Sequence, residues 1–249
     1  MERILDSWYS PSLGREMEIV VYGHYGPALL MFPSAAADYL EYERFYLIDS
    51  IEHLIDAGKI KVFSINSINS ESWLNHEMAP RQKAIRHQQY NRYIEDEVVP
   101  YINNATGGKT LTLTAGVSLG AFHAANVLFR RPDLFDGVIG MSGIYDLKKY
   151  SSGYWDEDVY FNSPMDYLPN LTDEGILEML RSKEHIHFLS GSGPYEDPSA
   201  TQAISDLLQM KQIPHNIEIW SSEWSHDWPT WREMLPNYLE RKVIEQETA

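Results

Sequence analysis

The stretch Gly116-Val117-Ser118-Leu119-Gly120 joins two segments of different periodicity, and it decides the fold. Residues 109–115 (KTLTLTA) alternate in the manner of a strand, and residues 121–131 have the composition of a helix. A strand that turns this sharply into a helix strains its apex residue and requires small neighbours. The pattern therefore predicts an exposed Ser118 hydroxyl at the end of a strand. The alternative is a glycine-rich turn in which Ser118 has only a structural role.

The rest of the chain alternates predicted strands with predicted helices, which indicates a mostly parallel sheet covered by helices on both faces. No repeat or linker divides it, so we expect one domain over 1–249 with an aromatic-rich cap insertion at about 144–182. The expected strands are 17–21, 28–32, 60–65, 109–115, 138–141, 185–189 and 216–220, and the expected helices are 38–57, 80–103, 121–131, 199–211 and 227–244.

Composition narrows the possible functions. The chain has 20 basic and 36 acidic residues, a net charge of −16, and no cysteine. Such a surface repels nucleic acids and anionic lipids, so we expect neither a nucleic-acid nor a membrane partner. The lack of cysteine excludes disulfides, thiolate catalysis and thiolate metal sites. Met1 to Asp6 has acids where a secretory segment needs apolar residues, which favours a cytoplasmic location.

An activated serine needs a base and an acid, and two later loops supply candidates in the expected order of nucleophile, carboxylate and histidine. The loop after strand 185–189 contains Glu196 and Asp197, and the loop after strand 216–220 contains His226. The sequence therefore predicts a triad of Ser118, Glu196 and His226. Asp197 is the alternative acid, because Glu196 could instead cap the helix that follows.

Other polar residues have structural explanations. Asp227 is expected to cap the final helix, where a carboxylate is favourable. His123 is expected to pack within its helix. His185 and His187 face one side of a strand without a third ligand, so no metal is expected, and the chemistry requires no cofactor.

Several motifs together resemble a known family. They are Phe32-Pro33-Ser34, the serine turn with its helix and 131–137 (RPDLFDG), 141–146 (MSGIYD), Gly193-Pro194-Tyr195-Glu196 and His226-Asp227-Trp228-Pro229. From about Val20 to Leu239 the chain is similar to the putative esterase family, which includes esterase D, enterochelin esterases, feruloyl esterases and mycolyltransferases. The resemblance implies an α/β-hydrolase fold, with Ser118, Glu196 and His226 as the triad. Ser34-Ala35-Ala36-Ala37 replaces the Ser-Gly-Leu-Thr-Cys segment of esterase D, which argues against a glutathione thioester substrate.

These residues predict a serine carboxylic-ester hydrolase that acts on a small-molecule ester through an acyl-enzyme. The oxyanion hole is expected to use the backbone N–H of Leu119 and that of Ala35, with Ala36 as the next choice. An acyltransferase would use the same triad, and a non-catalytic binding module would keep only the pocket.

Substrate contacts are expected from aromatic residues near the serine. The candidates are Tyr154 and Trp155 in the insertion and Trp228 beside the histidine loop. Each could instead serve only to pack the insertion or the final helix onto the body of the protein.

Overall fold

The computed structural model describes residues 1–244 and contains one eight-stranded sheet of order β1-β2-β4-β3-β5-β6-β7-β8. β1 pairs antiparallel with β2, and β2 antiparallel with β4, while all other pairs are parallel. The strands are β1 (Arg3–Ser10), β2 (Arg15–Tyr22), β3 (Ala28–Phe32), β4 (Lys61–Ile65), β5 (Thr112–Val117), β6 (Gly137–Met141), β7 (His185–Ser190) and β8 (Asn216–Ile219).

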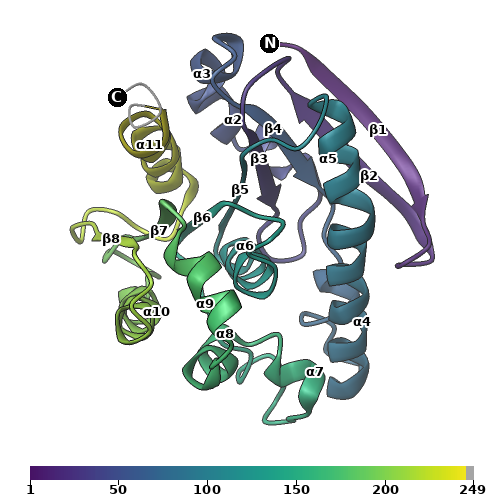
Figure 1. Ribbon diagram of the computed structural model, residues 1–249, viewed down its shortest axis with the longest axis vertical. Helices are drawn as coiled ribbons and strands as arrows, with labels where there is room; N and C mark the ends of the chain where they lie inside the picture. Colours follow the sequence, from purple (N-terminus) through teal and green to yellow (C-terminus); the bar gives the residue numbers. More distant parts are fainter. Residues whose placement is uncertain (245–249) are drawn as a thin grey trace.

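Helices cover both faces of this sheet, and α4 and α11 lie on opposite sides of it (Figure 1). Longer helices are α4 (Pro80–Tyr93), α5 (Val99–Ala105), α6 (Leu119–Arg130), α9 (Glu174–Arg181), α10 (Pro198–Met210) and α11 (Trp228–Tyr238). Shorter ones are α1 (Glu41–Arg44), α2 (Leu47–Ser50), α3 (Glu52–Asp56), α7 (Glu157–Tyr160) and α8 (Pro164–Tyr167). The 3₁₀ turns are η1 (Asn69–Glu71) and η3 (Leu168–Asn170), and the π-helical segments are η2 (Ile94–Val98) and η4 (Leu239–Ile244).

The period-two alternation of the strands separates two hydrophobic cores. Ile19, Leu30 and Phe63 belong to the core shared with α4, α6 and α10. Their neighbours Val20, Leu29 and Val62 belong to the core shared with α1–α3 and α11. The predicted α/β-hydrolase fold, a mostly parallel sheet between two helical layers, is therefore confirmed.

The continuous helix expected over 38–57 is wrong. The chain forms α1, α2 and α3 instead, because Tyr46 adopts a left-handed φ of 62° and Ile51 leaves the helical region. A left-handed residue cannot continue a right-handed helix. The apolar periodicity still buries Leu47, Ile48 and Ile55 on one face, which is why the sequence pattern looked unbroken.

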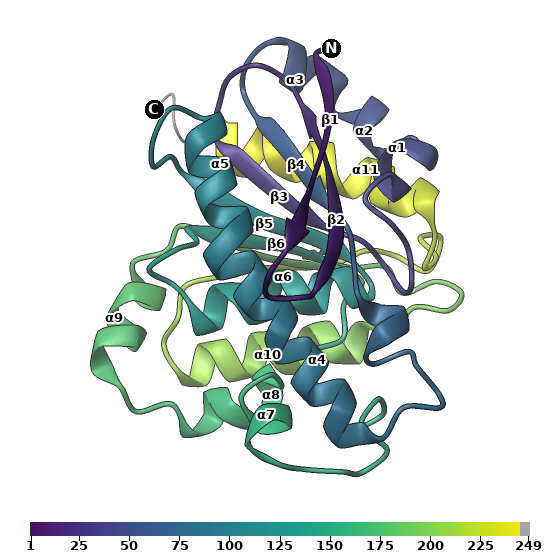
Figure 2. The same cartoon turned by 90° about the vertical axis from the view of Figure 1, so that its right-hand side faces the viewer.

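Two further details differ from the sequence prediction. The sequence prediction does not include β1, which forms an edge of the sheet and is mostly exposed (Figure 2). The helix expected over 80–103 contains the π-helical η2 just before Pro100, whose missing N–H prevents a regular bond at that point. The segment 144–182 holds α7, α8, η3 and α9, and its status as an insertion in a single domain stays a prediction.

Candidate active site

Ser118 lies at the turn between β5 and α6, at the carboxyl edge of the sheet. Its backbone has φ 54° and ψ −121°, and its N–H donates to the carbonyl of Met141 on β6 at 2.9 Å. A non-glycine residue in such a conformation costs about 1–3 kcal/mol and persists only where its surroundings enforce it. The turn thus holds a half-buried hydroxyl beside the first N–H groups of α6.

The glycines of the turn are required by close backbone approach. A Cβ on Gly116 would collide with the backbone of Gly120, and a Cβ on Gly120 would collide with the carbonyl of Phe32 at the end of β3. Tyr42 supports the same junction, because its hydroxyl donates to Phe32 O at 2.5 Å and accepts from Val117 N–H at 3.2 Å. The sequence pattern therefore reflects dense packing between the serine turn and β3.

The loops after β7 and β8 bring Glu196 and His226 together. Glu196 Oε2 lies 3.2 Å from His226 Nδ1, the carboxylate side chain is 1% exposed, and the imidazole is 26% exposed. Two backbone bonds join the loops: Gly193 N–H donates to Trp224 O at 2.8 Å, and His226 N–H donates to Pro194 O at 3.0 Å. The pair is thus held by its loops as well as by its own contact.

Glu196 receives three further hydrogen bonds. Ser142 Oγ donates to Oε1 at 2.6 Å, Gly191 N–H donates to Oε1 at 3.2 Å, and Ser190 Oγ donates to Oε2 at 3.3 Å. Burial acts to raise the pKa of this carboxyl, but the hydrogen bonds from His226, Ser142 and Gly191 outweigh burial and lower the pKa from its ordinary value. Glu196 is therefore a carboxylate at neutral pH, with its negative charge directed at the imidazole.

The two neighbouring aspartates have other partners. Asp197 is exposed and accepts from Ser199 N–H at 3.2 Å as the cap of α10. Asp227 accepts from Trp228 N–H at 2.8 Å as the cap of α11. Of the two alternatives for the acid, the structure brings Glu196 and not Asp197 to the histidine.

Ser118 connects to this pair through β6. Its N–H is bonded to Met141 O, and the next residue, Ser142, is bonded to Glu196 and accepts from Trp231 Nε1 at 2.9 Å. The Trp231 ring also meets the His226 ring edge-on at 5.1 Å. Within residues 1–244, no hydrogen bond joins Ser118 Oγ to His226. In ligand-free enzymes such bonds are often long and tighten only with substrate.

The two predicted oxyanion residues lie on the elements that flank the serine. Leu119 is the first residue of α6, where N–H groups have no intrahelical acceptor. Ala35 lies in the loop after β3, where Ser34 N–H donates to Glu41 Oε2 at 2.7 Å and Ala37 N–H to Ser34 O at 3.0 Å. Within residues 1–244, the N–H groups of Ala35 and Ala36 donate to no protein acceptor.

The three predicted substrate contacts have different surroundings. Tyr154 packs against the apolar cluster that contains Leu119, and its hydroxyl donates to Asp156 Oδ2 at 2.7 Å. Trp155 is 64% exposed and meets Tyr160 edge-on at 5.6 Å. Trp228 stacks on Phe45 at 4.5 Å. Tyr154 packs on the cluster of Leu119 and Trp228 on the cluster of Val117, so these two predicted contacts lie in different apolar clusters.

A cavity of about 580 Å³ lies between α4, the end of α6 and the α7–α9 segment. Arg130 and Tyr160 line it, whereas Ser118, Glu196 and His226 do not. No group of three or more His, Asp or Glu residues within 1–244 could hold a metal ion. No helix in that described range is long and apolar enough to cross a bilayer.

Sequence reasoning missed the residues that support the site. Ser142 follows β6 directly and could have been found, because polar residues at the carboxyl ends of parallel strands meet at one edge of the sheet. Glu41 and Asn69 carried no comparable signal, because only the packed loops place them beside the loop after β3.

Comparisons with known proteins agree with this architecture. The family described as Putative esterase matches residues 10–241. A solved ferulic acid esterase is 19% identical, with a TM-score of 0.75, and the match covers 96% of this chain and 95% of that one. The S-formylglutathione hydrolase FrmB of Staphylococcus aureus is 17% identical, with a TM-score of 0.68 and coverage of 97% and 98%.

A third solved structure is FphF, a fluorophosphonate-binding serine hydrolase of Staphylococcus aureus, at 16% identity, a TM-score of 0.69 and coverage of 97% and 98%. A sequence comparison with curated proteins gives no significant match. Likeness at this level of identity establishes the fold, and the family match extends over nearly the whole chain. The chain therefore belongs to the Putative esterase family and is an esterase.

Proposed function

We propose that this esterase hydrolyses small-molecule carboxylic esters through an acyl-enzyme on Ser118, with His226 as the base and Glu196 as the acid. The observation that carries the proposal is the buried Glu196 carboxylate at 3.2 Å from His226 Nδ1, at the same sheet edge as the strained Ser118 turn. A carboxylate on Nδ1 fixes the tautomer that leaves Nε2 as the proton acceptor.

In the first half of the reaction, His226 Nε2 takes the proton of Ser118 Oγ as the oxygen attacks the ester carbonyl carbon. The negative charge that develops on the carbonyl oxygen is stabilised by the N–H groups of Leu119 and Ala35. The tetrahedral intermediate then expels the alkoxide, which takes the proton from His226 and leaves as the alcohol. Ser118 remains acylated.

In the second half, water gives a proton to His226 and attacks the acyl carbon. The new intermediate collapses, Ser118 Oγ recovers the proton, and the carboxylic acid leaves. Glu196 stays ionised throughout and stabilises the imidazolium in each half-reaction. Tyr154, which is only partly buried and packs against the apolar cluster that contains Leu119, is the proposed apolar contact for one side of the ester.

We also propose that the protein is cytoplasmic and that it binds neither nucleic acids nor membranes. The acidic composition, with a net charge of −16, supports the absence of these two kinds of partner. Fractionation of the source cells would test the location.

The experiment compares wild type with Ser118→Ala on p-nitrophenyl acetate and on a fluorophosphonate probe. Wild type should turn over the ester and bind the probe covalently at Ser118, and the variant should do neither. Labelling or turnover that survives in a folded S118A protein refutes the nucleophile. Product analysis with and without an added alcohol distinguishes hydrolysis from acyl transfer.

A further inference from the structure

We propose that Asn69 and His123 form a buried positioning pair that fixes the backbone of Ala35 so that its N–H faces the reacting carbonyl. This inference rests on the proposed function and deepens it, because it explains how one half of the oxyanion hole is held in place. Neither residue touches the substrate in this proposal; both act through the loop after β3.

The backbone of Ala35 is strained. Its φ of 35° lies in the left-handed region, which an alanine avoids because of its Cβ. Strain of this kind persists only where the surrounding contacts over-determine the conformation. The residues that hold Ala35 in place are therefore part of the site that Ala35 belongs to.

Three side chains, one on β4 and two in the segment after it, donate hydrogen bonds to carbonyl oxygens of this loop. Ser64 Oγ donates to Tyr39 O at 2.8 Å, Ser67 Oγ donates to Ala37 O at 2.8 Å, and Asn69 Nδ2 donates to Ala35 O at 2.5 Å. These bonds hold the carbonyls of residues 35, 37 and 39, and the turn over 34–37 is closed by Ala37 N–H, which donates to Ser34 O at 3.0 Å. Only the Asn69 bond acts on the strained residue itself.

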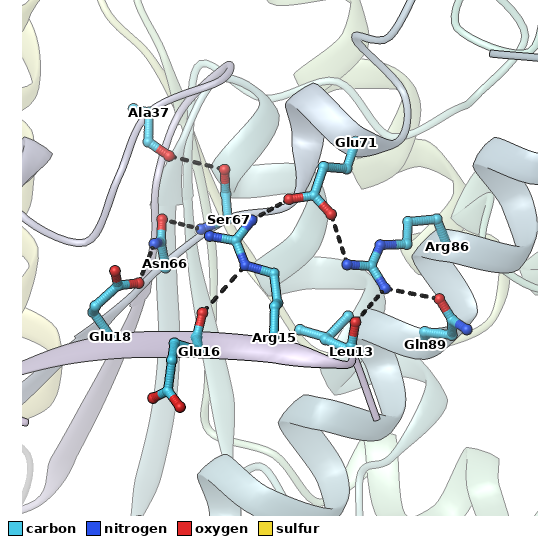
Figure 3. Close-up of polar contacts among 10 residues, drawn as sticks. All are labelled: Leu13, Arg15, Glu16, Glu18, Ala37, Asn66, Ser67, Glu71, Arg86 and Gln89. Atoms are coloured by element: carbon cyan, nitrogen blue, oxygen red, sulfur yellow. Dashed lines mark hydrogen bonds and ion pairs between the residues drawn. The ribbon is translucent and has the colours of Figure 1, made fainter. Parts of the chain in front are cut away.

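The segment that carries these donors is itself anchored from behind. Figure 3 shows Ser67 bonded to Ala37, Asn66 bonded to Glu18 on β2, and Glu71 paired with both Arg15 and Arg86. Strand β2, the loop 66–71 and helix α4 are thereby tied together. Asn69 therefore lies in a segment that hydrogen bonds and ion pairs hold to β2 and α4.

Asn69 is fully buried, and its two side-chain polar atoms have separate partners. Nδ2 faces the Ala35 carbonyl, which can only accept a hydrogen bond. Oδ1 lies 2.8 Å from His123 Nε2 and must therefore be the acceptor of that contact. This assignment puts the proton of His123 on Nε2 and prevents the amide from rotating by half a turn.

The environment of His123 keeps it in this state. Its ring lies 5.1 Å from that of His87, 5.5 Å from Tyr90 and 6.2 Å from Phe32. Burial lowers the pKa of His123 to about 3, so the imidazole is neutral throughout the working range of an esterase. His123 is therefore a permanent hydrogen-bond donor to Asn69 and not a second catalytic base.

A purely structural core would not need this pair. Burying an amide and an imidazole costs free energy that apolar side chains of the same volume would avoid. Besides the hydrogen bond between Asn69 and His123, Asn69 donates a hydrogen bond to the carbonyl of Ala35. The polar groups are therefore placed to hold that carbonyl and, with it, the φ and ψ of Ala35, which set the direction of the Ala35 N–H.

The test uses Asn69→Leu, which removes both hydrogen bonds at nearly constant volume, and the pair His123→Phe and His123→Gln. Gln can place its Nε2 amide where the histidine Nε2–H was, whereas Phe keeps the ring and loses the donor. Thr114→Val is the matched control, because Thr114 Oγ1 also donates to buried carbonyls, those of Ala124 and Gly137, away from the loop.

We expect kcat of N69L on p-nitrophenyl acetate to fall by about 10- to 100-fold, less than the loss of an entire oxyanion donor, with KM unchanged to within about twofold. The inhibition constant of an aryl trifluoromethyl ketone, which forms an oxyanion on the serine, should rise by the same factor. H123F should lose kcat in the same way, H123Q should recover it to within about threefold, and T114V should match wild type.

A folded N69L protein with wild-type kcat and inhibitor affinity overturns the inference, and so does an equal kcat loss in T114V. If N69L does not fold, H123F and H123Q decide, since equal activity in these two variants also overturns it. Wild-type protein without any ester turnover would overturn the proposed function instead, and the positioning role with it.

Discussion

Replacing Gly193 with alanine should separate the loop of Glu196 from the loop of His226. A Cβ on Gly193 would lie 2.6 Å from Trp224 O and 2.7 Å from Ser222 O, and both are backbone atoms that cannot rotate away. Ordinary van der Waals contact begins at 3.4 Å, so the loops must part by 3.4 − 2.6 = 0.8 Å. The φ of Gly193 is not in the left-handed region, so the clash is the only expected defect.

The size of the effect follows from the contact that is lost. If the 3.2 Å separation of Glu196 Oε2 and His226 Nδ1 grows by the same 0.8 Å, the hydrogen bond is broken. A hydrogen bond to a charged group is worth about 1.5–3 kcal/mol, which corresponds to a fall in kcat of about 10- to 150-fold. Overpacking should also lower the free energy of unfolding by about 1–3 kcal/mol.

The assay measures kcat and KM on p-nitrophenyl acetate, with urea unfolding for stability. Gly175→Ala is the control, because a Cβ there meets only the Asp173 side chain, at 3.2 Å, and its stability should stay within about 1 kcal/mol of wild type. If G193A acts through the acid, it should reduce kcat no further in a protein that already carries E196Q. A folded G193A enzyme with wild-type kcat, or additive losses in the double variant, would refute the reasoning.

Three further predictions concern the acid and its support. Glu196→Gln should lower kcat by about 10³- to 10⁴-fold, whereas Asp197→Asn, which keeps a good helix cap, should stay within about threefold of wild type; the reverse order would make Asp197 the acid. Ser142→Ala removes the 2.6 Å hydrogen bond to Glu196, so kcat should fall by about tenfold and the acid limb of its pH profile should move upward; an unchanged profile would contradict the role of Ser142. Because the folded pKa of Glu196 is below its ordinary 4.5, the carboxylate stabilises the fold above about pH 4.5 and loses this effect as the pH falls through the folded pKa. The unfolding free energies of wild type and E196Q should therefore converge on acidification, and a gap that widens would show the opposite sign.

Much of the site could be predicted from local sequence, because its main parts follow strand ends. Ser118, Glu196 and His226 each follow a predicted strand, and parallel strands bring their carboxyl ends to one edge of the sheet. The glycines of the serine turn mark backbone crowding that holds in any fold of this kind. The break at Tyr46 could not be predicted, since the apolar period of 38–57 is helical throughout and the break leaves its apolar residues in the core.

By itself, then, the sequence determined the layered α/β architecture and the order of the three polar residues, because periodicity and turn chemistry act over a few neighbouring residues. Only the tertiary structure distinguishes the contacts of Glu196 from those of Asp197, since both lie in one loop and the side chain of Glu196 alone contacts His226 within the described residues. The hydrogen-bond partners of the Ala35 carbonyl are likewise visible only in the tertiary structure. Asn69 and His123 reach that residue from positions 34 and 88 residues further along the chain, and no local pattern specifies contacts at such separations.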